Sequence, residues 1–302
     1  MRWRDGRRSD NIEDQRGAGG DAGYPGGMRL PGRIGIPGGR AGAGMGGLGL
    51  VALVVIALLL GVDPSQLLQG NLGDDSPGYA PRAPTSSEQA DLKDFVSAVL
   101  ADTEDTWSQQ FRTLGLTYQD PKLVLFSGAV DSACGFAQSA MGPFYCPPDR
   151  KVYLDLSFFQ ELEDRFQAPG DFAGAYVIAH EVGHHVQNLL GIMDKVDALR
   201  RRASETEANA LSVRLELQAD CLAGVWAVNA DRARHILEAG DIEEGLQAAA
   251  AVGDDRLQRQ SQGYVVPDSF THGSSEQRVR WFKRGFDSGR IDACDTFNVD
   301  RL

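Results

Sequence analysis

Two histidines four residues apart, in the segment His180–His184 (HEVGH), constrain this chain more than any other feature of its sequence. The surrounding residues, from Asp171 as the expected N-cap to Leu190, have the apolar pattern of a helix that stops at Gly191. Four positions advance a helix by roughly 400° and 6 Å, so both imidazoles leave one face, one turn apart. This spacing favours two ligands of a single tetrahedral Zn2+.

Glu181 lies about 100° around the same helix from His180, beside the expected ligand pair. From there its carboxylate can reach a water held by the metal without occupying the metal, which is the position of a general base. His185 is five residues from His180 and points off the ligand face, so we expect it to support the site or to pack. Side chains packed in an ordinary helix are the alternative interpretation of these histidines.

A catalytic zinc site needs a third protein ligand and one open position. We expect Glu216 to be this ligand, because it lies with Asp220 at i and i+4 on one face of an otherwise apolar helix predicted over about 204–228. Carboxylates on such a helix are costly unless they are paired or bound to metal. Asp220 then accepts an N–H from a ligating histidine. Two solvated acids are the alternative, and Glu205 and Glu207 are weaker candidates for the ligand.

His272 lies in a Thr-His-Gly-Ser-Ser segment that is typical of a turn before a helix. One hypothesis is that His272 donates a hydrogen bond to the negative charge that develops on a substrate oxygen. The other is that it only caps the helix or lies on the surface.

The longest apolar run, residues 46–62, has no charged residue and is near the lower length limit for crossing a hydrocarbon core. We expect an uncleaved transmembrane anchor there, with a buried core helix or a signal peptide as alternatives. The expected order is a disordered Gly/Arg-rich cytoplasmic tail over 1–45, the anchor over 46–62, a linker over 63–88 and a folded domain over 89–302.

The distribution of charged residues predicts on which side of the membrane these parts lie. Arginines precede the apolar run and Asp63, Asp74 and Asp75 follow it, which predicts a single-pass protein of the inner membrane with its C-terminal domain outside the cytoplasm. The formal net charge of −12 excludes nucleic acid as an expected partner, because phosphate binding needs a basic face.

The chain has four cysteines, Cys134, Cys146, Cys221 and Cys294, and none is in a C-x-x-C pair. An exported domain can hold them as disulfides, and Cys134 with Cys146 is the favoured pair because it closes a short loop. Three pairings are open from the sequence alone, and a zinc site of four thiolates is the poorly spaced alternative.

The periodicity of the remaining sequence predicts an α+β fold that is mainly helical with a small sheet. Strands are expected at 123–127 and 151–156, an irregular loop at 128–148, and a polar segment between Gly191 and the helix at 204–228. The other expected helices are 90–114, 157–166, 230–238, 242–252 and 275–288. The GPFYCP segment at 142–147, together with the strand that follows it, is similar to an edge strand that could pair with an extended substrate.

Short segments spread over nearly the whole chain carry a family resemblance. They are MRW at 1–3, SDNIED at 9–14, a Gly-rich stretch leading into one apolar run, Cys134-Gly135, GPFYCP at 142–147, HEVGHH at 180–185, ELQADCLAGVW at 216–226 and THGSSEQRVRWF at 271–282. With these segments in this order, the chain resembles the bacterial membrane-anchored neutral zinc metallopeptidase family.

The resemblance implies an extracytoplasmic, gluzincin-like (zincin) domain similar in site design to thermolysin. It puts the metal ligands at His180, His184 and Glu216 and the catalytic carboxylate at Glu181. The Thr-His-Gly stretch resembles the Thr-His-Pro stretch of membrane-bound zinc peptidases related to the heat-shock protease type, which favours a site role for His272.

The expected activity is hydrolysis of peptide bonds in a peptide or protein substrate, with Zn2+ as cofactor. Two alternatives stay open at this point. One is a non-catalytic zinc-stabilised domain that binds envelope partners, and the other is a zinc hydrolase of non-peptide substrates.

Overall fold

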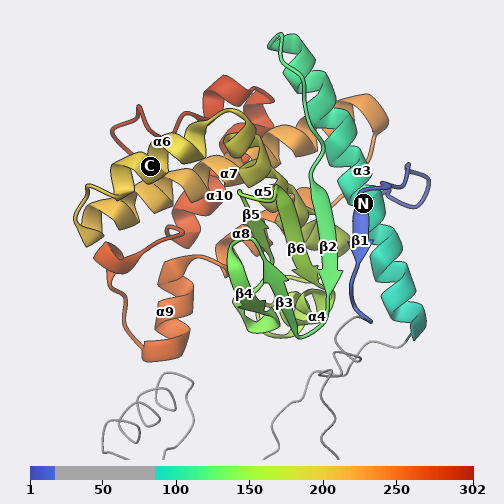
Figure 1. The fold of residues 1–302 in the computed structure, drawn as a ribbon, viewed down its shortest axis with the longest axis horizontal. Coiled ribbons are helices and arrows are strands. Elements are labelled where there is room, and N and C mark those ends of the chain that lie inside the picture. The colour runs from blue at the N-terminus through green and yellow to red at the C-terminus, as the bar shows by residue number, and fades with distance from the viewer. Residues whose placement is uncertain (18–85) are drawn as a thin grey trace, which may run out of the picture. The chain divides into compact units, whose positions relative to one another are not determined.

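The computed structural model describes residues 1–17 and 86–302. Most of these residues are helical, and the strands form one four-stranded sheet and one hairpin, as Figure 1 shows. The expected mainly helical α+β fold is therefore confirmed. The α-helices are α3 (Ser86–Thr113), α4 (Ser157–Asp164), α5 (Asp171–Leu189), α6 (Ile192–Arg200), α7 (Glu205–Arg234), α8 (Asp241–Ala251), α9 (Asp254–Gln262) and α10 (Ser275–Ser288). The strands are β1 (Ile12–Asp14), β2 (Lys122–Phe126), β3 (Ala129–Ser132), β4 (Gly135–Gln138), β5 (Phe144–Cys146) and β6 (Lys151–Asp155).

The four-stranded sheet has the order β1-β2-β6-β5. Strands β1, β2 and β6 are parallel, and β5 runs antiparallel to β6 in a register that pairs Tyr145 with Val152. The central strands β2 and β6 are short apolar runs buried over nearly their whole length, as expected for strands covered on both faces. Strand β5 pairs with β6 and with no other described strand, so it forms an edge of this sheet.

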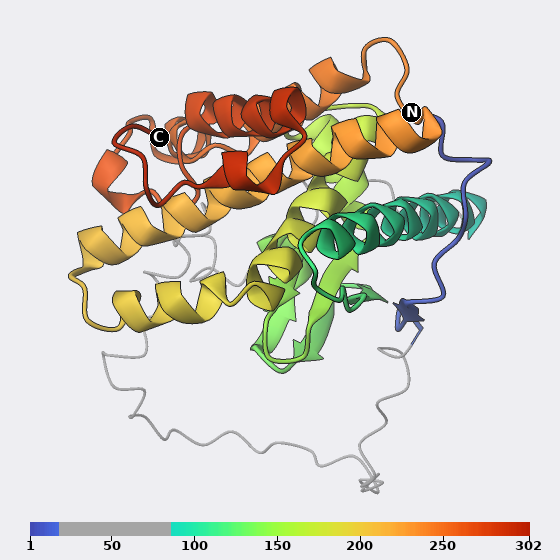
Figure 2. The same ribbon diagram turned by 90° about the horizontal axis from the view of Figure 1, so that it is seen from above.

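Helix α5 is buried over most of its length and contacts the sheet, α3, α7 and α8. In Figure 2 the long helix α7 lies between the sheet and α10. Helices α7 and α10 approach closely because glycine stands at the crossing on both. A Cβ on Gly285 would collide with the carbonyl of Cys221, and one on Gly224 would collide with the carbonyl of Phe282. This close packing fixes α7 relative to the C-terminal segment.

Several boundaries differ from those expected. The segment 128–148 is not an irregular loop, because it folds into the β3–β4 hairpin and the edge strand β5. The polar segment after Gly191 contains α6, and α9 was not expected. No separate helix covers 230–238, because α7 continues to Arg234 and ends where His235 takes the left-handed conformation. Short strands and polar helices leave little periodic signal, which is why the pattern missed them.

The expectation of a disordered tail over 1–45 is wrong for its first 17 residues. Strand β1 extends the sheet by pairing with β2, and the Trp3 ring packs edge-on against Phe95 and is 6% exposed. The Trp3 Nε1–H donates to the Asp171 carboxylate at 2.9 Å, in the first turn of α5. Residues 1–17 belong to the same compact unit as 86–302. The two segments therefore fold together.

The expected anchor over 46–62 and most of the expected linker over 63–88 lie outside the described residues. Among the residues that are described, no helix combines the length and the apolar character that a membrane span requires.

Replacing Trp3 with alanine tests whether the N-terminal segment is part of the folded unit. The Trp3→Ala variant should lose about 3 kcal/mol of unfolding free energy, because a buried indole and its hydrogen bond are removed. Urea denaturation measures this loss, with Asp10→Ala at an exposed position of the same segment as the control. An unchanged midpoint in Trp3→Ala would show that the segment does not contribute to the fold.

Candidate metal centre

Helix α5 presents His180 and His184 on its buried face, where they are 6% and 7% exposed. The Glu244 carboxylate accepts the backbone N–H of Phe172 at 3.1 Å, which satisfies a donor in the first turn of the helix. The helix stops before Gly191, which takes a left-handed conformation at φ 68°. Both histidines thus lie in the middle of a helix held at each end.

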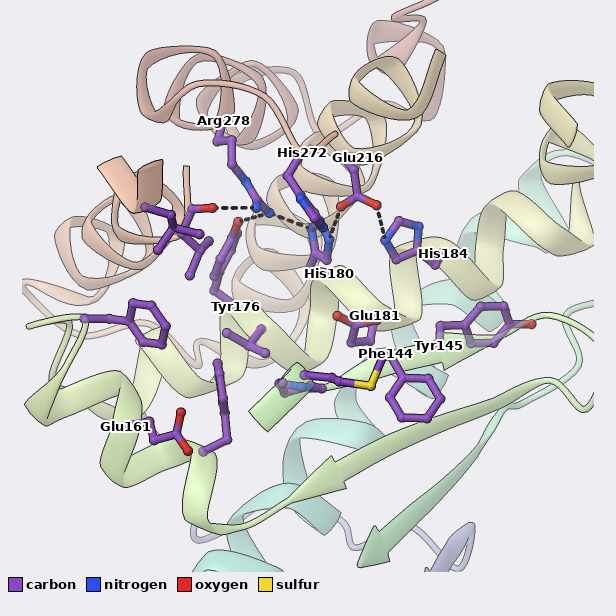
Figure 3. Close-up of a pocket in the computed structure, with 18 of the residues that line it drawn as sticks. Phe144, Tyr145, Glu161, Tyr176, His180, Glu181, His184, Glu216, His272 and Arg278 are labelled. Carbon is purple, nitrogen blue, oxygen red and sulfur yellow. Dashed lines mark hydrogen bonds and ion pairs between the residues drawn. The ribbon is translucent and has the colours of Figure 1, made fainter. Parts of the chain in front are cut away.

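Glu216 of α7 faces the two histidines, as Figure 3 shows. Its Oε2 lies 3.1 Å from His180 Nε2, and its Oε1 lies 3.4 Å from His184 Nε2. His180, His184 and Glu216 each have a possible ligand atom, and these three atoms lie within 4.8 Å of one another. Ligands of a tetrahedral zinc at bonds of about 2.0–2.1 Å are roughly 3.4 Å apart. Two imidazole nitrogens and one carboxylate at these distances fit Zn2+ and leave a fourth position open.

The three residues are coupled electrostatically. Burial lowers the pKa of His180, but the Asp220 and Glu216 carboxylates outweigh burial and raise it to about 10. Burial opposes ionisation of Glu216, yet both histidines hold its pKa well below the ordinary value. An ionised carboxylate between two histidines is the state that a cation requires, and metal binding must displace the proton of His180.

Asp220 holds His180 in place, as expected. Its Oδ1 lies 2.9 Å from His180 Nδ1, and its side chain is fully buried. Arg278 of α10 donates from Nε to Oδ2 and from Nη2 to Oδ1, both at 2.9 Å, and the Tyr176 hydroxyl donates to Oδ1 at 2.5 Å. These contacts compensate the buried charge and fix the ring of His180.

Gln187 holds His184 in a similar way, and the sequence pattern assigned it no role. Its Oε1 lies 2.8 Å from His184 Nδ1, and its Nε2 donates to the carbonyl of Leu215 at 2.7 Å. Gln187 therefore ties the orientation of His184 to α7 next to Glu216. Its only sequence signal is the i+3 spacing from His184 on a helix of apolar neighbours.

Glu181 and His272 line the same cavity, which has a volume of about 510 Å³. Burial raises the pKa of Glu181, although both histidines oppose this. The His272 ring is about half exposed at 52%, so it can reach a bound molecule. Both side chains therefore line the cavity beside the candidate metal ligands, and their catalytic roles stay predictions.

Asp254, at the start of α9, positions His272 and was not expected. Its Oδ2 accepts the backbone N–H groups of Thr271, His272 and Gly273 at 2.8, 2.6 and 3.0 Å. Its Oδ1 lies 3.3 Å from His272 Nδ1. A hydrogen bond to this carboxylate raises the pKa of His272. Asp254 thus engages Nδ1 of the ring, and Nε2 is the ring nitrogen left to donate a proton.

His185 supports the site from the other side of α5. Its Nε2 lies 2.6 Å from the carbonyl of Gln119, and its Nδ1 lies 2.9 Å from the hydroxyl of Tyr145 on the edge strand β5. His185 is fully buried, and burial lowers its pKa to about 4. It joins α5, the helix of His180 and His184, to β5, as expected for a supporting residue.

The weaker ligand candidates lie elsewhere. Glu207 forms a capping box with Ser204 at the start of α7, and Glu205 is exposed beside it. The four cysteines form two disulfides, Cys134 with Cys146 and Cys221 with Cys294. The favoured pairing is therefore confirmed and the four-thiolate zinc site is excluded.

The candidate site belongs to the class of His-His-Glu metal centres on helical scaffolds. One helix carries the paired histidines, and a second helix carries the glutamate and the supporting aspartate. Comparison with known proteins identifies the family. The sequence model of the family described as "Putative neutral zinc metallopeptidase" matches residues 1–297, so the chain belongs to this family.

Two relatives show the extent of the similarity. The uncharacterized protein YpfJ of Escherichia coli is 52% identical over 298 residues, covering 98% of this chain and 99% of its own length. The uncharacterized protein Mb2605 of Mycobacterium bovis is 43% identical over 258 residues, covering 82% and 86%. No solved structure matches the chain.

Replacing Gln187 with methionine, which is of similar size, should weaken zinc binding roughly 10- to 100-fold, because His184 loses the group that orients it. Competition with a zinc chelator measures the affinity. Gln247→Met, at an exposed position on α8, should bind zinc like the wild type. Equal affinities in the two variants would contradict the role of Gln187.

His185 should make the stability depend on pH between about 4 and 6.5. In this window the unfolded histidine takes up a proton and the folded one does not, so stability falls as the pH falls, by at most about 3 kcal/mol. Urea denaturation from pH 4 to 7 should give a flatter curve for His185→Phe than for the wild type. The exposed His235→Asn variant should keep the wild-type slope, and an equally steep curve in His185→Phe would contradict the assignment.

Proposed function

We propose that this chain is a zinc-dependent peptidase that hydrolyses peptide bonds with Glu181 as general base. The observation that supports this most is the convergence of His180, His184 and Glu216 on one point at the wall of an open cavity, with Glu181 beside it. Three ligands that leave a fourth position open are typical of catalytic zinc sites, and four closed ligands are typical of structural ones.

When bound, Zn2+ supplies Lewis acidity, which activates water for attack and polarises a carbonyl oxygen. Glu181 takes the proton of the attacking water and later passes it to the leaving amine. Burial raises the pKa of this carboxyl group, and a higher pKa makes it a better proton acceptor near neutral pH.

His272 acts on the other side of the reacting carbonyl. Asp254 holds the ring by Nδ1, and Nε2 can then donate to the negative charge that develops on the scissile oxygen. Arg278 lines the same cavity but is fully engaged with Asp220 and Tyr176, so its role is to position His180.

Substrate binding uses the edge strand. Phe144 and Tyr145 of β5 line the cavity, and β5 is paired on the side of β6. An extended peptide can add to such an edge through backbone hydrogen bonds. This placement favours peptides or unfolded protein segments over compact non-peptide substrates.

The two disulfides support a proposal for the compartment. Two disulfides persist in oxidising surroundings, so we propose that the folded body lies outside the cytoplasm. A single membrane crossing at the apolar residues 46–62 would put residues 1–17 on the opposite side from the body with which they fold, so we propose that this run associates with the inner membrane without a single crossing. Residues 1–17 then lie on the same side as the body.

The decisive experiment compares full-length wild type with Glu181→Gln. Each protein is loaded with zinc, its metal content is measured by mass spectrometry, and it is incubated with an unbiased peptide library. Glu181→Gln should keep one zinc per chain and lose 10²- to 10⁴-fold in cleavage rate, because the proton acceptor is removed.

Glu205→Gln is the matched control, since Glu205 is exposed at the start of α7 away from the cavity. It should cleave at the wild-type rate. Equal cleavage by Glu181→Gln and wild type would remove Glu181 from the mechanism. A zinc-loaded wild type that cleaves no peptide would favour the zinc-stabilised binding domain or a non-peptide hydrolase.

A further inference from the structure

The cavity that contains the candidate metal ligands extends beyond them along α5, toward the N-terminal end of the helix. There its wall changes from titratable to apolar. Five side chains from α4, the segment after α4, α5, the end of α8 and α9 form this part, here called the apolar pocket. They are Phe158, Phe166, Val177, Val252 and Leu257.

The apolar pocket begins next to the metal ligands. Val177 precedes His180 by three residues, which is about 4.5 Å along the helix axis. An extended peptide advances about 3.3 Å per residue. A substrate whose scissile carbonyl is held at His180 therefore places one of its flanking side chains, at most about two residues away, against Val177.

The shape of the apolar pocket is fixed by packing. The rings of Phe158 and Phe166 lie 6.2 Å apart, and both side chains are 8% exposed, so they form a firm wall with only their inner faces accessible. Gly142, at φ 79°, lines the same cavity next to Phe158, where an added Cβ would stand 3.8 Å from the Phe158 ring. The absence of a side chain at Gly142 keeps the entrance beside Phe158 open.

The charged side chains beside the apolar pocket are Glu161 and Arg165 at its rim, and Arg278, which donates to the carbonyl of Val252 at 3.4 Å. Glu161 lies 4.0 Å from Arg165, and the Arg165 guanidinium stacks over the Phe166 ring at 5.2 Å. Figure 3 shows Glu161 on the side of the cavity away from His184. The hydroxyl of Tyr176, which also lines the cavity, is engaged with Asp220 and Arg278, so Tyr176 offers its ring rather than a free polar group.

We propose that the apolar pocket binds a large apolar side chain, leucine, methionine or phenylalanine, of the residue flanking the scissile bond. This inference rests on the proposed peptidase function and names its substrate class. A basic side chain is disfavoured, because the wall of the apolar pocket is apolar and the Glu161 carboxylate at its rim already has the Arg165 guanidinium 4.0 Å away. Small side chains leave the pocket unfilled and gain little from burial. Leu257 is then a specificity-determining residue.

The test separates binding from cleavage. Hydroxamates of glycine, leucine, phenylalanine and lysine are titrated by calorimetry into the zinc-loaded full-length chain, and a peptide library is cleaved in parallel. Leucine and phenylalanine hydroxamates should bind on the order of 10- to 100-fold tighter than the glycine compound. The same preference should appear at the residue flanking each cleaved bond.

Leu257→Trp fills the apolar pocket and should reduce both preferences to a few-fold. Leu199→Trp is the matched control, because Leu199 is 55% exposed on α6, another nine-residue helix, and lies outside the cavity. It should keep the wild-type preference. Circular dichroism and zinc content show that both variants are folded.

Each outcome has a separate meaning. Selective hydroxamate binding that Leu257→Trp removes supports the apolar pocket, even if no peptide is cleaved, in which case the peptidase proposal fails alone. Cleavage with no apolar preference, with a preference for lysine, or with a preference that Leu257→Trp leaves intact overturns the pocket and leaves the peptidase proposal standing. Hydroxamates that bind without discrimination also overturn it.

Discussion

The buried carboxylate of Asp220 is the interaction on which the rest of the site depends. It accepts hydrogen bonds from groups on α5 and α10 while belonging to α7, so one side chain joins three helices. A fully buried carboxylate is costly unless every lone pair is used and its charge is balanced. Arg278 supplies the balance, and the resulting pair fixes the ring of His180 from behind. The glycine contacts between α7 and α10 bring Arg278 within reach of Asp220.

The charges around the cavity explain why the site suits a cation. Three acids, the buried Glu181 and Asp220 and the partly exposed Glu216, lie near one buried guanidinium, that of Arg278. In the metal-free chain, the raised pKa of His180 and the raised pKa of Glu181 both reduce the excess negative charge. A bound dication replaces those protons, so metal affinity should be coupled to proton release. The raised pKa of Glu181 also means that its carboxylate accepts a proton more readily.

Much of the candidate site could be predicted because its residues carry strong local signals. His180 and His184 are one helical turn apart, and Glu216 and Asp220 are acids on an apolar helix, so periodicity alone brought out all four. The disulfide of Cys134 with Cys146 followed from loop length. These predictions needed only the spacing of residue types within one element.

The residues that were missed depend on contacts between distant elements. Arg278 is an ordinary arginine in an amphipathic helix, and only the packing of α10 against α7 takes it to Asp220. Asp254 reads as a helix-starting acid until Thr271–Gly273 folds over it. The Gly/Arg/Pro-rich composition of the N-terminal segment predicted disorder, although Trp3 packs against Phe95 and β1 pairs with β2. Composition reports average polarity, whereas a few well-placed side chains decide whether a short segment folds.

The pairing of β1 with β2 also sets an order of events during synthesis. Strand β1 meets a partner roughly 110 residues further along the chain, so at usual rates of 5–20 residues per second it waits about 6–20 seconds for β2 to be made. Strand β2 is the second strand of this sheet to be made, and β5 and β6 follow it along the chain. Contacts this distant in sequence slow folding, and until they form, the edge of β2 stays open to other chains.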